Sequence, residues 1–327
     1  MNLLQTHRAD TGVCLRPDGI TMVRVMRAWR QPAKVRCIEE RPIRSGLLRP
    51  SCTEVNVENV DELARDLAAA VGSARTRTVA LSLPDGCVSM AILPFESLPV
   101  GERERETLVR WRFQHDRRCA LTDEQIAYRI YPAPARTPHP AGSADGGTVT
   151  AYVMAIAVKP SILRQYHMVC EQAGLLPVSI GFSSLQAFDL CRMSVAPASE
   201  HFWALRMSDR LTFVACRGGV PVFLRGTRVK EHDDVRAELV SSLQCFDDDC
   251  PHSDGPSGTD PAILYVMREQ VDEQKDQPED RALWTPAGHP RWQVEVRNGW
   301  PEGRQLWPPD TTMSIGRWCA LASTEVV

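Results

Sequence analysis

The stretch TGVCLRPDGITMVRV, residues 11–25, alternates apolar residues with small or polar ones on both sides of the turn RPDG. Alternation with a period of two places the apolar side chains of each half on one face of a strand. Proline, aspartate and glycine together are typical of a tight turn. The stretch therefore predicts two short antiparallel strands, and the rest of the chain is interpreted outward from this hairpin.

Composition limits the class of protein. The chain has 327 residues, of which 43% are hydrophobic, enough to fill the cores of about two domains. It carries 38 basic and 41 acidic residues, a net charge of −3, so no overall field favours a nucleic acid or an anionic membrane. The longest apolar run, VTAYVMAIAV at 149–158, is about half of a membrane span and predicts a buried strand. With no signal peptide at the N-terminus, we expect a cytoplasmic protein without nucleic-acid partners.

The eleven cysteines are scattered, odd in number and placed mostly in apolar runs. This distribution predicts reduced, buried thiols rather than a disulfide framework. Cys245, Cys250 and His252 in CFDDDCPH leave a metal site as an alternative. Their spacing lacks a second ligand pair, so we interpret the segment as a solvated loop that follows a helix and expect no metal.

One order of elements occurs twice along the chain. The first hairpin is followed by a third strand, AKVRCIEERPI, and by a helix, VDELARDLAAAV, that ends at Gly72. After residue 200, the strands FWALRMS, RLTFVAC and VPVFLRGTRV precede the long helix DDVRAELVSSLQCF. The duplication predicts an α/β protein with a first domain at 1–200 and a second at 201–327.

An insertion interrupts the first copy. TRTVALSLPDGCVSMAILPF predicts a further hairpin, whose strands are Val79–Leu83 and Val88–Leu93. A charged helix with an apolar stripe, the strand IAYRIYP, a loop rich in Pro, Gly and Ala at 132–147 and the strand of 149–158 follow. We place the inserted subdomain at about 84–159.

Several segments, in order along the chain, are similar to PilM-like type IV pilus assembly proteins. VALSLPDGCVSMAILPFESLPVGERERETLVRWRFQHD resembles that family's succession of two LP-ended strands and a Glu-rich helix. CEQAGLLPVSIGFSSLQAFDLCR resembles its helix, strand and second helix, and CRGGVPVFLRGTRV, ELVSSLQCF and SIGRWCALA resemble its later hairpin and helices. The likeness spans most of the chain.

The resemblance implies the actin-like ATPase (ribonuclease H-like) duplicated fold, with the inserted subdomain of the PilM and FtsA branch. It also implies a scaffold at the inner face of the cytoplasmic membrane that binds the cytoplasmic tail of a PilN-like inner-membrane protein, together with other assembly proteins. Membrane association would then be peripheral and through partners only. A GspL-like adaptor that docks a secretion ATPase remains an alternative.

The nucleotide motifs of the actin-like fold are degenerate in this chain. The acid of the first hairpin would fall at Cys14, Leu15 or Arg16, and Pro17 removes an amide donor. The second hairpin has Arg206 at the position of the acid, and no glycine follows AILYVM where the third motif is expected. We therefore predict a non-catalytic protein with no cofactor. In the alternative, a divergent ATPase, the phosphate and metal contacts would come from the degenerate positions Asp18, Gly19, Thr21, Ser208 and Asp209.

The resemblance also suggests where a partner binds. By the family's arrangement, a groove between the first subdomain and the insertion would accept an extended tail by strand addition or in apolar pockets. The predicted contacts are Val79, Leu81 and Leu83, with Arg110, Arg112 and Arg117 available to acidic positions. Trp284, Trp292, Trp300 and Trp307 are either a further partner surface or anchors of irregular backbone.

Overall fold

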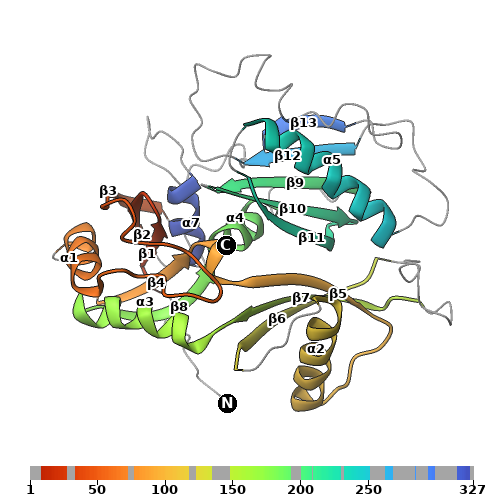
Figure 1. Cartoon of the computed structure of the whole chain (residues 1–327), viewed down its shortest axis with the longest axis horizontal. Coiled ribbons are helices and arrows are strands. Elements are labelled where there is room, and N and C mark those ends of the chain that lie inside the picture. The colour runs from red at the N-terminus through yellow and green to blue at the C-terminus, as the bar shows by residue number, and fades with distance from the viewer. Residues whose placement is uncertain are drawn as a thin grey trace.

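The computed structural model contains three β-sheets and the helices that cover them (Figure 1). It describes residues 9–27, 34–72, 77–117, 123–134, 148–192, 200–207, 209–229, 232–250, 262–267, 284, 294–298 and 315–324. No helix within these ranges is both long enough and apolar enough to cross a membrane. The loop expected at 132–147 lies almost entirely outside them, as do His252 and three of the four C-terminal tryptophans.

The first sheet is built around the hairpin of the opening stretch. In spatial order its strands are β3 (Lys34–Pro42), β2 (Gly19–Met26), β1 (Thr11–Arg16), β4 (Thr78–Leu83) and β8 (Leu176–Phe182). The first three are antiparallel, whereas β1, β4 and β8 are parallel. The predicted hairpin is confirmed, with Arg16 paired to Gly19 across its turn.

The second sheet repeats this arrangement. Its strands are β11 (Val220–Arg228), β10 (Arg210–Arg217), β9 (Glu200–Met207), β12 (Ala262–Met267) and β13 (Val294–Asn298). Here too the first three strands are antiparallel and the pairs β9–β12 and β12–β13 are parallel. In both sheets the strand order is third, second, first, fourth and fifth, so the duplication expected from the sequence is confirmed.

The third sheet consists of β5 (Ser89–Phe95), β7 (Ala151–Val158) and β6 (Gln125–Pro132), all antiparallel. The predicted hairpin of Val79–Leu83 and Val88–Leu93 is wrong. β4 pairs with β1 and β8 in the first sheet, whereas β5 pairs with β7 in the third. The 3-10 helix Asp85–Cys87 redirects the chain from one sheet to the other. The division into two domains and an insertion stays a prediction, because pairing within sheets does not test it.

Helices cover the sheets through apolar faces that the sequence spacing predicted. They are α1 (Val60–Val71), α2 (Glu102–Arg117), α3 (Pro160–Gln172), α4 (Ser183–Arg192), α5 (His232–Asp249) and α7 (Ile315–Ser323). The side chain of Asn59 caps α1 by accepting a hydrogen bond from the backbone N–H of Glu62 at 3.0 Å. Val109 and Phe113 of α2 pack on β5 and β7. Seven of the described cysteines are buried, as their apolar surroundings predicted.

The two ends of the described chain meet in the first sheet. The last helix, α7, packs on β1, although the two are at opposite ends of the colour scale in Figure 1. A Cβ atom at Gly12 would lie 1.7 Å from the carbonyl oxygen of Ala320, so only glycine permits this approach. Arg317 of α7 also forms an ion pair with Glu40 of β3 at 2.9 Å. The C-terminal helix is therefore part of the first sheet's core.

Candidate functional site

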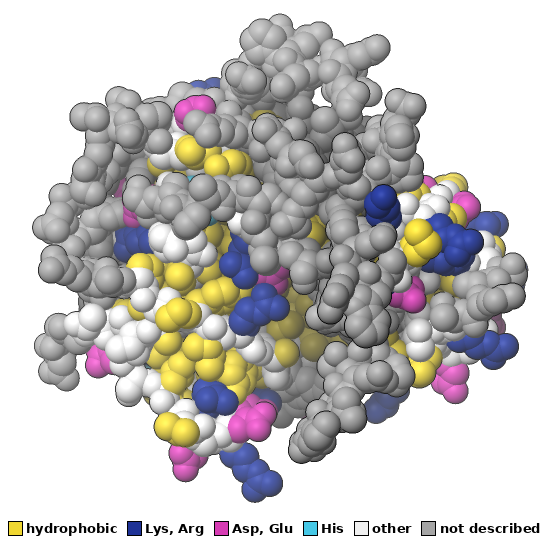
Figure 2. All heavy atoms as spheres, turned by 180° about the vertical axis from the view of Figure 1, so that it is seen from behind, with side chains coloured by type: hydrophobic (Ala, Val, Ile, Leu, Met, Phe, Trp, Pro, Cys, Tyr) yellow, Lys and Arg dark blue, Asp and Glu magenta, His cyan; other side chains and the backbone are white. Residues whose placement is uncertain are grey.

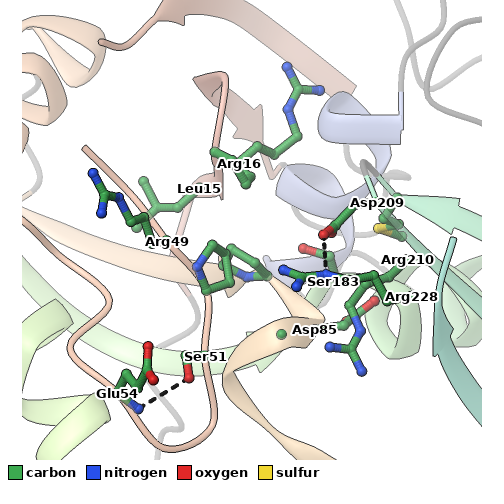
Figure 3. A pocket seen from close by; sticks show the side chains of 15 residues that line it. Leu15, Arg16, Arg49, Ser51, Glu54, Asp85, Ser183, Asp209, Arg210 and Arg228 are labelled. Carbon is green, nitrogen blue, oxygen red and sulfur yellow. Dashed lines mark hydrogen bonds and ion pairs between the residues drawn. The ribbon is translucent and has the colours of Figure 1, made fainter. Parts of the chain in front are cut away.

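A cavity of about 630 Å³ lies where elements of the first and second sheets face each other (Figure 3). The turn of the β1–β2 hairpin contributes Arg16 and Pro17, and the β9–β10 hairpin contributes Asp209 and Arg210. The loop of residues 49–54, the 3-10 helix after β4, the start of α4 and the end of β11 complete its wall. Equivalent hairpins of the two copies thus meet at one cavity.

The first hairpin presents a cation and a proline to this cavity. The guanidinium of Arg16 donates to the carboxylate of Asp18 at 3.2 Å, and the Asp18 side chain is largely exposed. Gly19 begins β2, and Thr21 is fully buried behind it. Asp18, Gly19 and Thr21 do not line the cavity. The hairpin therefore offers no carboxylate to a ligand there.

The second hairpin presents a neutralised acid. The Asp209 carboxylate accepts a hydrogen bond from Arg228 Nε at 2.6 Å, which pairs the turn with the end of β11. Arg210 also lines the cavity, and its buried Nε has no partner among the described residues. Ser208 lies outside the described residues. Of the four degenerate positions that the structure describes, only Asp209 lines the cavity, and it is paired with Arg228.

Asp85 is the most unusual group in the cavity wall. It lies in the turn directly after β4, is 3% exposed, and its Oδ1 accepts from the backbone N–H of Ser184 at the start of α4 at 3.0 Å. Its Oδ2 has no partner within the described chain. Burial raises the pKa of this carboxyl, against the hydrogen bonds of Ser184 and the charge of Arg210. Buried, incompletely satisfied acids with shifted pKa values are typical of functional positions.

The loop that forms the opposite wall is fixed by a buried polar network. The side-chain oxygen of Gln165 accepts from the backbone N–H groups of Asn56 at 2.8 Å and Val57 at 3.1 Å, which ties the loop to α3. The Asn56 amide donates to Cys87 Sγ at 3.1 Å and contacts the Tyr166 hydroxyl at 3.4 Å. Because Cys87 and Asp85 lie in the same 3-10 helix, the network also fixes the position of Asp85 relative to the loop.

Glycine is required where this loop meets the acid. A Cβ atom at Gly86 would lie 2.7 Å from the Pro50 side chain and 3.0 Å from its carbonyl oxygen. The sequence therefore places the smallest residue directly after Asp85, so that the backbone of the loop can approach. Gly86 and Pro50 both line the cavity, so their close contact forms part of its wall.

The residues predicted to bind a partner do not form one surface. Val79, Leu81 and Leu83 are fully buried in β4, the strand between β1 and β8. Their side chains belong to the core and offer nothing to a partner, which corrects that part of the prediction. The predicted hairpin would have paired β4 with β5, whereas β4 pairs with β1 and β8 inside the first sheet.

The three predicted arginines lie on α2, which packs on the third sheet. Arg110 donates to the carbonyl oxygen of Glu124 at 3.0 Å, and Arg112 donates to Asp116 at 3.0 Å. Arg117 is the last residue of α2, and its side chain lies outside the described part. Their role toward a partner stays a prediction.

The CFDDDCPH segment gives no support to a metal site within the described residues. Cys245 Sγ accepts from Arg225 Nη1 at 2.8 Å, and Cys250 is buried with its thiol 3.9 Å from the Val222 carbonyl oxygen. No group of three or more metal-ligating side chains occurs in the described part of the chain. Trp284 is buried, in keeping with an anchoring role for that one tryptophan.

Sequence reasoning missed Asp85, Ser183 and Arg210. The available signal was their position in the sequence, because Asp85 lies two residues after the apolar strand β4 and Ser183 directly follows the apolar strand β8. Those strands are parallel, so their carboxyl ends meet at one edge of the sheet, where sites in α/β folds commonly lie. Taking the first of them for half of a hairpin concealed this signal.

The duplicated sheets, their strand order and the cavity between their hairpins define an actin-like fold. A solved structure described as a PilM-PilN type IV pilus biogenesis complex matches 98% of this chain and 98% of its own with a TM-score of 0.67 and 17% identity. A Bacteroides thetaiotaomicron protein with an actin-like ATPase fold and unknown function matches 91% of this chain and 93% of its own, with a TM-score of 0.50 and 12% identity.

A weaker likeness is to the cytoplasmic domain of EpsL, an inner membrane component of the type II secretion system of Vibrio cholerae. It has a TM-score of 0.45 and 10% identity, over 96% of this chain and 93% of that one. No protein-family model and no curated protein sequence matches the chain. The actin-like fold expected from the sequence is confirmed, and structural likeness is its basis.

Proposed function

We propose that this protein is a non-catalytic cytoplasmic scaffold of a type IV pilus or related secretion assembly, which binds the cytoplasmic tail of a PilN-like inner-membrane protein. The observation that carries the proposal is the likeness to the PilM-PilN complex over 98% of both chains. A match over 98% of this chain extends across both sheets of the duplicated fold and the third sheet.

The chemistry of the cavity supports the non-catalytic part. A magnesium nucleotide needs close N–H donors for its phosphates and free carboxylates for the metal. The first hairpin supplies Pro17, which has no N–H, and the second supplies Asp209, which is paired with Arg228. The other acids of the wall are Glu54, which is exposed, and Asp85, whose pKa is raised by burial. These residues do not fit Mg²⁺·ATP bound in the manner of an ATPase.

Titration with nucleotide tests this part directly. We expect ATP with Mg²⁺ at millimolar concentration to leave the melting temperature unchanged, because a ligand stabilises a protein only if it binds the folded state. Differential scanning fluorimetry measures the shift, with ATP alone and Mg²⁺ alone as controls. A saturable rise in melting temperature at sub-millimolar ATP and Mg²⁺ would favour the divergent ATPase instead.

An edge of the first sheet is the best place for a tail. β8 is its last strand, and no described strand pairs with its outer side. Leu176 and Val178 of β8 are 59% and 37% exposed, and Met168 of the neighbouring α3 is also exposed. An unpaired edge with alternate apolar side chains is suited to an added extended strand.

The third sheet offers apolar surface as well. Figure 2 shows hydrophobic side chains gathered on the side of the molecule where β5, β6 and β7 lie. Ile92 and Ile156 alternate with residues of the cluster under α2, and they are partly buried against the main core, toward which β11 packs on β5. An added strand at β8 and an apolar face on the inserted sheet together agree with a groove between the first subdomain and the insertion.

Substitution of the β8 edge tests the docking proposal. We expect the double variant Leu176→Asp and Val178→Asp to weaken binding of the synthetic N-terminal peptide of the host's PilN-like protein at least tenfold, about 1.4 kcal/mol. Val100→Asp is the matched control, because Val100 is an exposed valine, 97% accessible, at another site. Isothermal titration calorimetry measures Kd. If the double variant and the control bind the peptide with equal affinity, β8 is not the docking site. If the wild-type protein does not bind the peptide, the PilN-like tail is not the partner.

A further inference from the structure

Two cysteines from opposite ends of the chain lie together beneath the cavity. Cys14 is in β1 and Cys319 is in α7, and both are buried. Gly12 and Cys14 are two positions apart on a strand, so they share the face that packs on Ala320 of α7. The close approach at Gly12 thus brings the Cys14 side chain toward the helix that carries Cys319.

The two thiols share Ser183 as a partner. Cys14 Sγ lies 3.7 Å from Ser183 Oγ, and Cys319 Sγ donates to the Ser183 carbonyl oxygen at 3.3 Å. Each thiol also acts on the pKa of the other through a side-chain hydrogen bond. Cys87, by comparison, is hydrogen-bonded to Asn56 and Tyr166. A pair of thiols in contact is the arrangement from which a disulfide forms.

The pair lies next to the cavity and has an internal asymmetry. Ser183, which both thiols contact, lines the cavity, so a small molecule in the cavity comes within one residue of the thiols. The hydrogen bond from Cys319 is the largest cause that lowers the pKa of the Cys14 thiol, and the charge of Arg16 acts in the same direction. Burial raises the pKa of Cys319. Cys14 is therefore the better nucleophile and Cys319 the resolving thiol.

We propose that Cys14 and Cys319 form a reversible disulfide when a small hydroperoxide enters the cavity, which locks the last helix to the first strand. The Cys14 thiolate attacks one peroxide oxygen, so that an S–O bond forms, the O–O bond breaks and the departing hydroxide takes up the Cys14 proton as water. Cys319 then attacks the sulfenic sulfur, an S–S bond replaces the S–O bond, and a second water leaves with the Cys319 proton. Two thiols are thereby oxidised and one hydrogen peroxide is reduced to two waters.

Peptide mapping of the full-length wild-type protein tests this inference. The reduced protein is exposed to hydrogen peroxide, quenched by alkylation in denaturant, digested without reductant and analysed by mass spectrometry. We expect the peptides that contain Cys14 and Cys319 to be joined in the first intramolecular disulfide to form, and dithiothreitol to separate them. Oxidation of other cysteines while Cys14 and Cys319 remain alkylated would overturn the inference, as would overoxidation of Cys14 without a cross-link.

Matched variants make the assignment specific. Cys170→Ala removes a buried thiol of α3 that has no described thiol partner, and we expect the cross-link to form in it as in wild type. In Cys14→Ala we expect Cys319 to stay reduced. The wild-type map decides the question even if Cys14→Ala fails to fold. As a second readout, oxidised wild type should melt at a higher temperature than reduced wild type, since the cross-link closes nearly the whole chain; an unchanged melting temperature in cross-linked protein would contradict the lock.

Discussion

Replacement of Gly12 by valine is expected to lower the free energy of unfolding by on the order of 3 kcal/mol or more, or to prevent folding. A Cβ atom at this position would lie 1.7 Å from the carbonyl oxygen of Ala320 and 2.6 Å from Ser323 Oγ. Because the closest atom belongs to helix backbone, no side-chain rotation relieves the clash. The whole of α7 must move from β1, which exposes the apolar residues that the helix buries. Urea denaturation followed by circular dichroism measures the loss.

Gly226→Ala is the control for Gly12→Val. Gly226 is also a strand glycine, but a Cβ there would meet only Thr212 Oγ1, at 4.0 Å. We expect this variant to stay within about 0.5 kcal/mol of wild type, as is usual for a substitution that removes no contact. Wild-type stability of Gly12→Val would show that α7 does not sit on β1 as described.

Replacement of Asp85 by asparagine is expected to stabilise the protein at pH 8 by roughly 1–3 kcal/mol. Asparagine keeps the oxygen that accepts from Ser184 N–H, and it removes a buried charge whose second oxygen has no described partner. The gain should depend on pH. Burial raises the pKa of Asp85 in the folded state, so the wild-type carboxyl favours folding while it is protonated and loses that contribution as pH rises through the folded pKa.

The difference between Asp85→Asn and wild type should therefore be largest in alkaline buffer and shrink as pH falls toward the ordinary aspartate pKa. Thermal unfolding from pH 4 to pH 8 measures it. Asp18→Asn is the control, since the Asp18 side chain is largely exposed and is paired with Arg16 at the turn; we expect it to change stability by less than about 0.5 kcal/mol. If Asp85→Asn is the less stable protein at pH 8, the charged carboxylate has a favourable partner and the proposed protonation is wrong.

A destabilising acid in the wall of a cavity has a bearing on function. Proteins retain such groups where a site needs them, at a cost in stability. In this chain the acid remains, whereas the hairpins beside it present Pro17 and the paired Asp209. The cavity wall therefore combines one buried acid of raised pKa with the proline and the paired acid of the two hairpins.

The sequence predicted the elements well because local patterns determine them. Alternation of apolar and polar residues predicted β1 and β2, and helical spacing of apolar residues predicted α1 and α3. Gly72 ends α1, as predicted, and has a positive φ of 64°. The repeat of three strands and a helix gave the duplicated architecture. These signals lie within ten to twenty neighbouring residues, over which propensity and periodicity act.

The same kind of pattern failed at residues 78–95. Two apolar strands on either side of PDGC have the pattern of a hairpin whether they pair with each other or with distant strands. In the structure β4 joins β1 and β8, and β5 joins β7. Strand partners are selected by tertiary packing, so the pattern could not tell the two arrangements apart.

For the candidate site, the sequence by itself shows which residues of the expected nucleotide motifs this chain lacks. The absence of an acid at 14–16, the proline at 17 and the lack of glycine after β12 are visible in the letters alone. Only the tertiary structure shows which groups line the cavity and which distant residues contact each other. Asp85, Ser183 and Arg210 line one cavity, Arg228 neutralises Asp209, and Gly12 admits the helix that carries Cys319 to the strand that carries Cys14. These groups are tens to hundreds of residues apart, and they meet because burial of apolar faces, rather than any local preference, brings the two ends of the chain together.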